Sequence, residues 1–172
     1  MEISQLIEET LYEIEDALQT ALKGLTLAEI IWRPSDEVNA IGFTLWHQAR
    51  VEDSWVSNFA LKVPQIFERD GWSKKWVIPA FDTGFGYTTR ELTEFVTPPV
   101  PELLEYAGMV RMRTCQYLSG LAAGDFDFVP ETDHPWRQGY TIGRMFGHMV
   151  CELSQHLGHI RYLRGLQRGL NN

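Results

Sequence analysis

The segment from residue 148 to residue 159 carries three histidines and one glutamate within a single helical pattern. His148, Glu152 and His156 recur every four residues, so each lies only about 40° around the helix axis from the one before. His159 falls between them on the same face. Imidazole nitrogens and carboxylate oxygens are ligands that zinc, nickel and iron accept, so this face is a candidate metal site.

The residues beside this face place it at the border of an apolar core. Met149, Leu153, Leu157 and Ile160 flank the polar residues at helical spacing. A carboxylate and several imidazoles inside such a core are costly unless they face water or share a cation. A single histidine on a helix is more often an ordinary core or surface residue, but this combination favours a metal site.

A single helix cannot surround an ion, so a further ligand is expected from another segment. His47 is the obvious donor, because Val51 and Ser54 at helical spacing place it on or next to an interior face. The alternative is a histidine that is partly buried against Trp55 and bonded to a carbonyl, and spacing alone does not decide between the two. His134, in an Asp-His-Pro-Trp loop, is predicted to be solvated.

The apolar periodicity predicts an all-α chain with four long helices and no internal repeat, so residues 1–172 are interpreted as one domain. Thr141 is a credible N-cap for the last helix, and Pro101 suits the start of the third. Helical segments are predicted at residues 3–25, 41–61, 101–121 and 142–166, with shorter ones at 27–32 and 88–96.

The connection between the second and third long helices, residues 64–101, is long and aromatic. Idle loops are short and polar, so we expect this connection to pack over one end of the bundle. Its length permits a crossover as well as simple up-and-down order.

Composition and charge exclude several classes of protein. The net charge of −8, from 23 acids against 15 bases, argues against a nucleic-acid partner. The acidic N-terminus does not resemble a signal peptide and no segment is long enough to span a bilayer, so a soluble cytoplasmic protein is expected. Cys115 and Cys151 are interpreted as small buried side chains. With 44% hydrophobic residues the chain has ample core material, which favours a functional metal site over a structural one.

A stripe of small side chains also follows the last predicted helix. Glycine weakens a helix interior by roughly 1 kcal/mol relative to alanine, so such a stripe suggests that another backbone approaches closely. Packing against the first helix is the favoured interpretation, and a homodimer is the alternative. The stripe consists of Gly143, Gly147, Cys151, Ser154, Gly158 and Gly165.

Residues 41–55, residues 148–165 and the Trp-Arg-Pro after the first helix resemble the DinB-like superfamily of metal-binding four-helix bundles. The resemblance covers essentially the whole chain and implies a bundle with a crossover connection between helices two and three. It also implies a divalent metal ion held by His47, Glu152 and His156. Many relatives have histidine at the position of Glu152, whereas the branch similar to mycothiol-dependent maleylpyruvate isomerase has glutamate.

The same resemblance suggests roles for the other two histidines of the last helix. His159 stands where relatives often carry glutamine, which implies a residue that orients a ligand by hydrogen bonding. His148 is either a fourth ligand or a hydrogen-bond partner of Glu152. The family commonly forms dimers.

Three protein ligands leave coordination positions open, which is typical of catalytic sites. The resemblance therefore implies an enzyme acting on a small molecule, either a hydrolase or a transferase that uses a low-molecular-weight thiol such as mycothiol or bacillithiol. Zinc or nickel is the expected ion, with iron or manganese as options. Since Glu152 as a ligand is not free to act as a base, His148 or Asp133 is the candidate for proton transfer. A non-catalytic metal-binding or stress-associated bundle is the alternative.

Most of the six tryptophans are expected to anchor the core and the loops, as is usual for this residue type. Trp46 and Trp136 are the two that could also line a pocket. The chain has no Gly-x-Ser-x-Gly elbow, no phosphate-binding glycine loop and no His-Glu-x-x-His motif, so no rival catalytic set competes with the histidine cluster.

Overall fold

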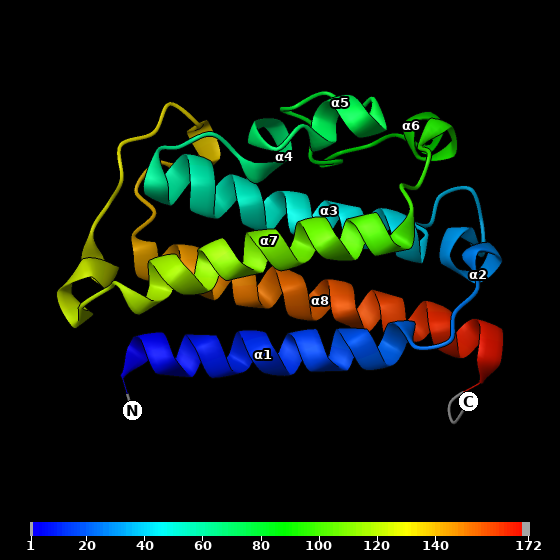
Figure 1. The fold of residues 1–172 in the computed structure, drawn as a ribbon, viewed down its shortest axis with the longest axis horizontal. Coiled ribbons are helices and arrows are strands. Elements are labelled where there is room, and N and C mark those ends of the chain that lie inside the picture. The colour runs from blue at the N-terminus through cyan, green and yellow to red at the C-terminus, as the bar shows by residue number, and fades with distance from the viewer. Residues whose placement is uncertain (1, 170–172) are drawn as a thin grey trace.

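The computed structural model describes residues 2–169, and within that range the regular structure is entirely helical. None of these helices is both long enough and apolar enough to cross a membrane. The four long helices pack side by side as a bundle, as predicted (Figure 1). They are α1 (Ile3–Leu22), α3 (Ile41–Asp53), α7 (Val100–Ser119) and α8 (Ile142–Arg168).

The directions of the four helices confirm the crossover. Helices α1 and α8 run in one direction and lie against each other, whereas α3 and α7 both run in the opposite direction (Figure 1). Since α3 and α7 are parallel, the chain between them must return along the length of the bundle. The Thr141 cap predicted from the sequence is present, because its side chain accepts a hydrogen bond from the backbone N–H of Arg144.

The shorter elements occupy the connections. Helix α2 (Leu27–Ile31) begins with a capping box formed by Thr26 and Glu29. Helix α3 does not continue as a regular α-helix to residue 61 as predicted, because it passes into a π-helical segment, η1 (Ser54–Leu61). The remaining short elements are α4 (Ile66–Arg69), α5 (Trp72–Trp76), α6 (Thr89–Glu94), η2 (Ala123–Asp127) and η3 (Pro135–Arg137).

The crossover segment covers a long side of the bundle, so the expectation that it would cover one end was wrong. Helices α4, α5 and α6 follow one another along α3, on the side away from α1 (Figure 1). Phe67 and Trp72 pack in a cluster with Ala49 of α3 and Tyr106 of α7. The aromatic residues of the segment therefore enlarge the hydrophobic core on the side of the bundle formed by α3 and α7.

A fully buried arginine fastens the later part of the crossover segment to α3. Arg50 donates hydrogen bonds to the carbonyl of Ala80 at 2.7 Å, to the carbonyl of Asp82 at 3.0 Å and to Gln65 Oε1 at 2.7 Å. Its guanidinium lies 3.8 Å from the centre of the Phe67 ring. One side chain of α3 thus fixes the path of residues 80–82.

A fully buried aspartate fastens the earlier part in the same way. Asp53 accepts hydrogen bonds from the backbone N–H of Ile66 at 3.1 Å and of Phe67 at 2.9 Å. It also accepts one from the Tyr106 hydroxyl at 2.9 Å and lies 3.5 Å from Arg50. Because the charges of Arg50 and Asp53 are paired and hydrogen-bonded, both can be buried.

Most of the stripe of small residues on α8 faces outward, so the interpretation that it packs against α1 was wrong; Gly143 is the exception, because a Cβ there would lie 3.1 Å from the carbonyl oxygen of Phe126 in η2. A Cβ added at Gly147 or Gly158 would have no atom of the described structure within 4 Å, and Ser154 is exposed. Cys151 is also exposed, contrary to the prediction that it is buried. The contact of α8 with α1 is made instead by larger residues such as Leu157. The homodimer stays a prediction.

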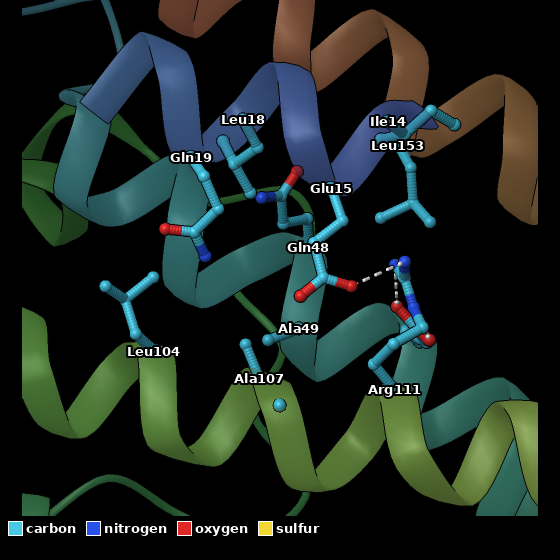
Figure 2. Close-up of a pocket in the computed structure, with 12 residues that line it drawn as sticks. Ile14, Glu15, Leu18, Gln19, Gln48, Ala49, Leu104, Ala107, Arg111 and Leu153 are labelled. Atoms are coloured by element: carbon cyan, nitrogen blue, oxygen red, sulfur yellow. Dashed lines mark hydrogen bonds and ion pairs between the residues drawn. The ribbon is translucent and has the colours of Figure 1, made fainter. Parts of the chain in front are cut away.

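A small cavity of about 50 Å³ lies between α1, α3 and α7, and Leu153 of α8 also lines it (Figure 2). Arg111 of α7 lies at its edge and forms two 2.9 Å hydrogen bonds with the carboxylate of Glu52. It also donates to the carbonyl of Leu11 at 2.9 Å, which ties α7 to α1. A cavity of this size holds only a few water molecules, so it is not a site for an organic substrate.

Candidate metal centre

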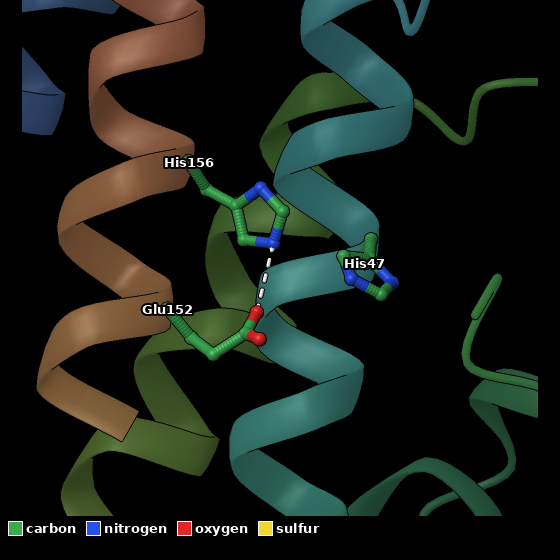
Figure 3. A group of neighbouring side chains, drawn as sticks. All are labelled: His47, Glu152 and His156. Atoms are coloured by element: carbon green, nitrogen blue, oxygen red, sulfur yellow. Dashed lines mark ion pairs between the residues drawn. The ribbon is translucent and has the colours of Figure 1, made fainter. Parts of the chain in front are cut away.

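Three of the predicted ligands meet between α3 and α8. His47 of α3 faces Glu152 and His156 of α8 (Figure 3), and one possible ligand atom from each lies within 4.8 Å of the other two. Nε2 of His156 lies 3.2 Å from Oε2 of Glu152. Ligand atoms about 2.1 Å from one tetrahedral zinc ion lie roughly 3.4 Å apart, so side-chain movements of about 1 Å would be needed to close the cluster on an ion.

The orientation of His47 is set by a backbone carbonyl. Its Nδ1 is hydrogen-bonded to the carbonyl oxygen of Thr83, in the loop between α5 and α6. Because a carbonyl can only accept, Nδ1 carries the proton and the lone pair of Nε2 is free for a metal ion. Histidine ligands in metalloproteins are typically held in this way. The alternative of a carbonyl-bonded histidine, left open by the sequence, is thus compatible with the ligand role.

The ionisation of the cluster also suits a cation. Burial lowers the pKa of His47 below its ordinary value, which keeps the imidazole neutral. The neighbouring His156 lowers the pKa of Glu152, which keeps the carboxylate ionised. Neutral imidazole and ionised carboxylate are the forms that bind a metal ion.

His156 has the feature that most directly indicates a missing partner. Both of its ring nitrogens are buried and neither forms a hydrogen bond in the described structure; Nε2 has only the 3.2 Å ion-pair contact with Oε2 of Glu152. An unsatisfied buried polar atom costs about 1 to 3 kcal/mol. A cation between the three side chains would remove this cost at Nε2. The donor set therefore fits a divalent ion.

The cluster is closed on the α3 side and open on the α8 side. His47 is buried, with its ring stacked 5.9 Å from the ring of Phe43. The side chain of Glu152 is 31% exposed, against 14% for that of His156. Solvent and small molecules can therefore approach past Glu152.

The sequence profile of the DinB superfamily matches residues 10–160, a range that includes His47, Glu152 and His156. The chain belongs to the DinB superfamily. A crystal structure of a conserved protein from Enterococcus faecalis has a TM-score of 0.82 to this chain at 22% sequence identity, covering 96% of this chain and 97% of that one. At this identity the likeness shows a shared fold. No curated protein matches the chain.

In this DinB chain His148 lies beside the cluster and not within it. Its Nε2 is 3.8 Å from Oε1 of Glu152, and its ring packs 5.4 Å from that of Trp55. His159 is exposed, with its ring 5.8 Å from that of His156. A proton-transfer role for His148 and an orienting role for His159 stay predictions.

The other candidate residues are not members of the cluster of His47, Glu152 and His156 in this DinB chain. Asp133 and His134 are both exposed in the loop before η3, as predicted for His134. Trp46 is fully buried, which excludes it from an open pocket, whereas Trp136 is exposed. Sequence reasoning missed Thr83, and no side-chain pattern could have identified it, because its backbone carbonyl makes the contact.

Proposed function

We propose that the protein is a divalent-metal-dependent enzyme that acts on a small molecule, with His47, Glu152 and His156 as the metal ligands. The observation that carries this proposal is the His156 ring, whose buried nitrogens form no hydrogen bond in the described structure although they lie beside the neutral His47 imidazole and the ionised Glu152 carboxylate. Zinc and nickel suit this donor set best, and iron and manganese are also compatible with it.

The reaction is proposed to be either hydrolysis or transfer that involves a low-molecular-weight thiol. A divalent ion bound at such a site lowers the pKa of a water or a thiol, which supplies a nucleophile at neutral pH. Of the residues present, Thr83 and His47 fix the buried side of the site, and Glu152 is a ligand and not a free base. His148, with a side chain 37% exposed beside Glu152, is in position to exchange a proton with an arriving group.

Exposure favours the enzyme over a purely structural metal site. A structural ion is normally surrounded by protein ligands, whereas a catalytic ion keeps open positions. The exposed side of Glu152 and the half-exposed His148 support the open arrangement. A non-catalytic metal-binding bundle is the alternative that the experiment must separate.

The test combines elemental analysis with a single substitution. Glu152→Gln should lower the affinity for zinc at least tenfold and abolish turnover of ester, amide or thiol-acceptor substrates, because the anionic ligand is lost. Glu13→Gln, an exposed glutamate of α1, is the matched control and should change neither. Zinc binding by Glu152→Gln with unchanged affinity would refute the ligand set. A bound metal that raises the melting temperature without any turnover would establish the non-catalytic alternative.

A further inference from the structure

In the part of the chain that the structure describes, two arginines near the candidate metal centre form no ion pair with an acidic residue. Arg137 of η3 donates hydrogen bonds to the carbonyl of Ser54 at 3.1 Å and to its hydroxyl at 2.9 Å, and its guanidinium lies 4.1 Å from the centre of the Trp55 ring. Arg144, in the first turn of α8, lies 3.9 Å from the centre of the Tyr140 ring. Within residues 2–169, neither guanidinium forms an ion pair with a carboxylate.

The absence of a counter-ion is notable in a chain with a net charge of −8. The buried Arg50 lies 3.5 Å from Asp53, and the largely buried Arg111 lies 2.9 Å from Glu52. Arg137 is partly buried without such a partner, and burial lowers its pKa to about 10. A desolvated cation of this kind is costly to keep unpaired unless it serves to attract an anion.

A continuous layer of rings connects the two arginines to the metal ligands. The rings of Trp55 and Tyr140 stack 5.3 Å apart, and His148 packs edge-on against both at 5.4 and 6.1 Å. His148 in turn lies 3.8 Å from Glu152. Trp55 is buried, whereas Tyr140 and His148 are partly exposed, so the layer of rings lies between the arginines and the metal ligands.

The position along α3 gives the approximate length of this layer. Ser54, which holds Arg137, follows His47 by seven residues. Seven residues of α-helix make two turns, so the two side chains share a face and are separated by about 10 Å along the axis. A molecule of a few carbon atoms can bridge such a distance.

Two loops frame the same region. The loop that contains Thr83 and orients His47 continues to Phe85, whose ring lies 5.8 Å from that of Trp136. Phe85 and Trp136 are both 74% exposed, and Trp136 is followed directly by Arg137. The loop that positions a metal ligand therefore touches the loop that carries the unpaired arginine.

We propose that Arg137 binds an anionic oxygen group, a carboxylate or a phosphate, of the small molecule whose reactive end reaches the metal ligands. The proposal rests on the proposed function and adds to it the class of substrate, an organic acid or a phosphate ester. Ser54 accepts only two of the N–H bonds of Arg137, which leaves others for a ligand. A planar guanidinium matches a carboxylate or phosphate in a bidentate way.

Titration of the metal-free full-length protein with succinate and, separately, with inorganic phosphate tests this inference. Binding is followed by NMR at the Ser54 amide and the Trp55 indole, which adjoin Arg137. Arg137→Gln should weaken binding by roughly tenfold to a hundredfold, because a charge-assisted hydrogen bond is lost. Arg137→Lys should retain part of the affinity, since the charge remains but the planar fork does not.

Arg90→Gln is the matched control, because Arg90 is an exposed arginine on α6 that pairs only with Glu94. It should bind both anions like the wild type, and equal melting temperatures show that the variants are folded. Binding of succinate alone would identify the ligand group as a carboxylate, and binding of phosphate alone would identify a phosphate ester. Failure of both anions to bind, or affinity in Arg137→Gln within about twofold of the wild type, would overturn the inference.

The use of metal-free protein separates this inference from the proposed function. If the zinc-binding test fails, the ligand role of His47, Glu152 and His156 is refuted, but the result of the anion titration is not affected. Anion binding that does not depend on Arg137 would refute the inference without affecting the metal ligands.

Discussion

Substitution of Gly84 by alanine should destabilise the protein more than the same substitution at Gly86, two residues further along the same loop. Both glycines have a left-handed φ, +76° for Gly84 and +75° for Gly86. A Cβ at Gly84 would lie 2.6 Å from Trp46 and 2.8 Å from Phe43, whereas a Cβ at Gly86 would have no atom of the described structure within 4 Å. Comparing the two variants therefore separates the cost of backbone strain, which both share, from the cost of steric overlap, which only Gly84→Ala has.

The expected losses in the free energy of unfolding follow from backbone strain and steric overlap. A left-handed conformation costs a non-glycine residue about 1 to 2 kcal/mol, which is the full effect expected for Gly86→Ala. Overpacking adds about 1 to 3 kcal/mol, so Gly84→Ala should cost about 2 to 5 kcal/mol. Trp46 is completely buried and cannot move aside. The loop must shift instead, which displaces the neighbouring Thr83 carbonyl and should weaken zinc binding through His47.

Urea unfolding of the metal-free proteins, followed by circular dichroism, measures the first effect. Competition with a chromophoric chelator measures the affinity for zinc. Equal losses of stability in the two variants would show that the close approach of Gly84 to Trp46 does not govern the packing. A destabilised Gly84→Ala protein with wild-type zinc affinity would show that the Thr83 carbonyl does not orient the ligand.

Two further predictions concern the charged groups of α3. Arg50→Met should lower the free energy of unfolding by about 3 to 5 kcal/mol, because the buried Asp53 loses its nearer cation and keeps only Arg113 at 4.0 Å, whereas the exposed Arg90→Met should cost little; urea unfolding tests both. The pKa of His47 is lower in the folded than in the unfolded protein, so its contribution to stability is complete above the unfolded pKa of about 6.5 and is lost as the pH falls through the folded value. The melting temperature of the metal-free protein should therefore fall as the pH is lowered from 7.5 to 5, and His47→Gln should reduce this slope; an unchanged slope would contradict the assignment.

The four long helices could be predicted because their apolar residues recur at helical spacing and their ends carry recognisable residues such as Thr141. The path of the crossover segment could not, because it depends on Arg50 and Asp53. Charged residues in a helix are usually solvated, so a sequence pattern treats both as surface positions. Only the structure shows that they are buried and hold the carbonyls and amides of residues 66–82.

The spacing of side chains on the last helix singled out His148, Glu152, His156 and His159 as candidates, and the resemblance to the DinB superfamily narrowed the expected ligands to Glu152, His156 and His47. The stripe of small residues on α8 shows the limit of spacing, since glycines at helical intervals look the same whether a backbone packs on them or solvent does. Gly147 and Gly158 face open space. Arg137 could not be identified either, because an unpaired arginine differs from a paired one only in its three-dimensional surroundings.

The burial of α3 determines how the cluster can close on an ion. Arg50 and Asp53 fix α3 to the crossover segment, and Thr83 in that segment fixes the ring of His47. Moving His47 toward an ion would therefore disturb several buried hydrogen bonds. The contraction of about 1 Å that a zinc ion would require is therefore expected from α8, where Glu152 is partly exposed. The site is thus a rigid imidazole on one helix that faces an adaptable carboxylate on another.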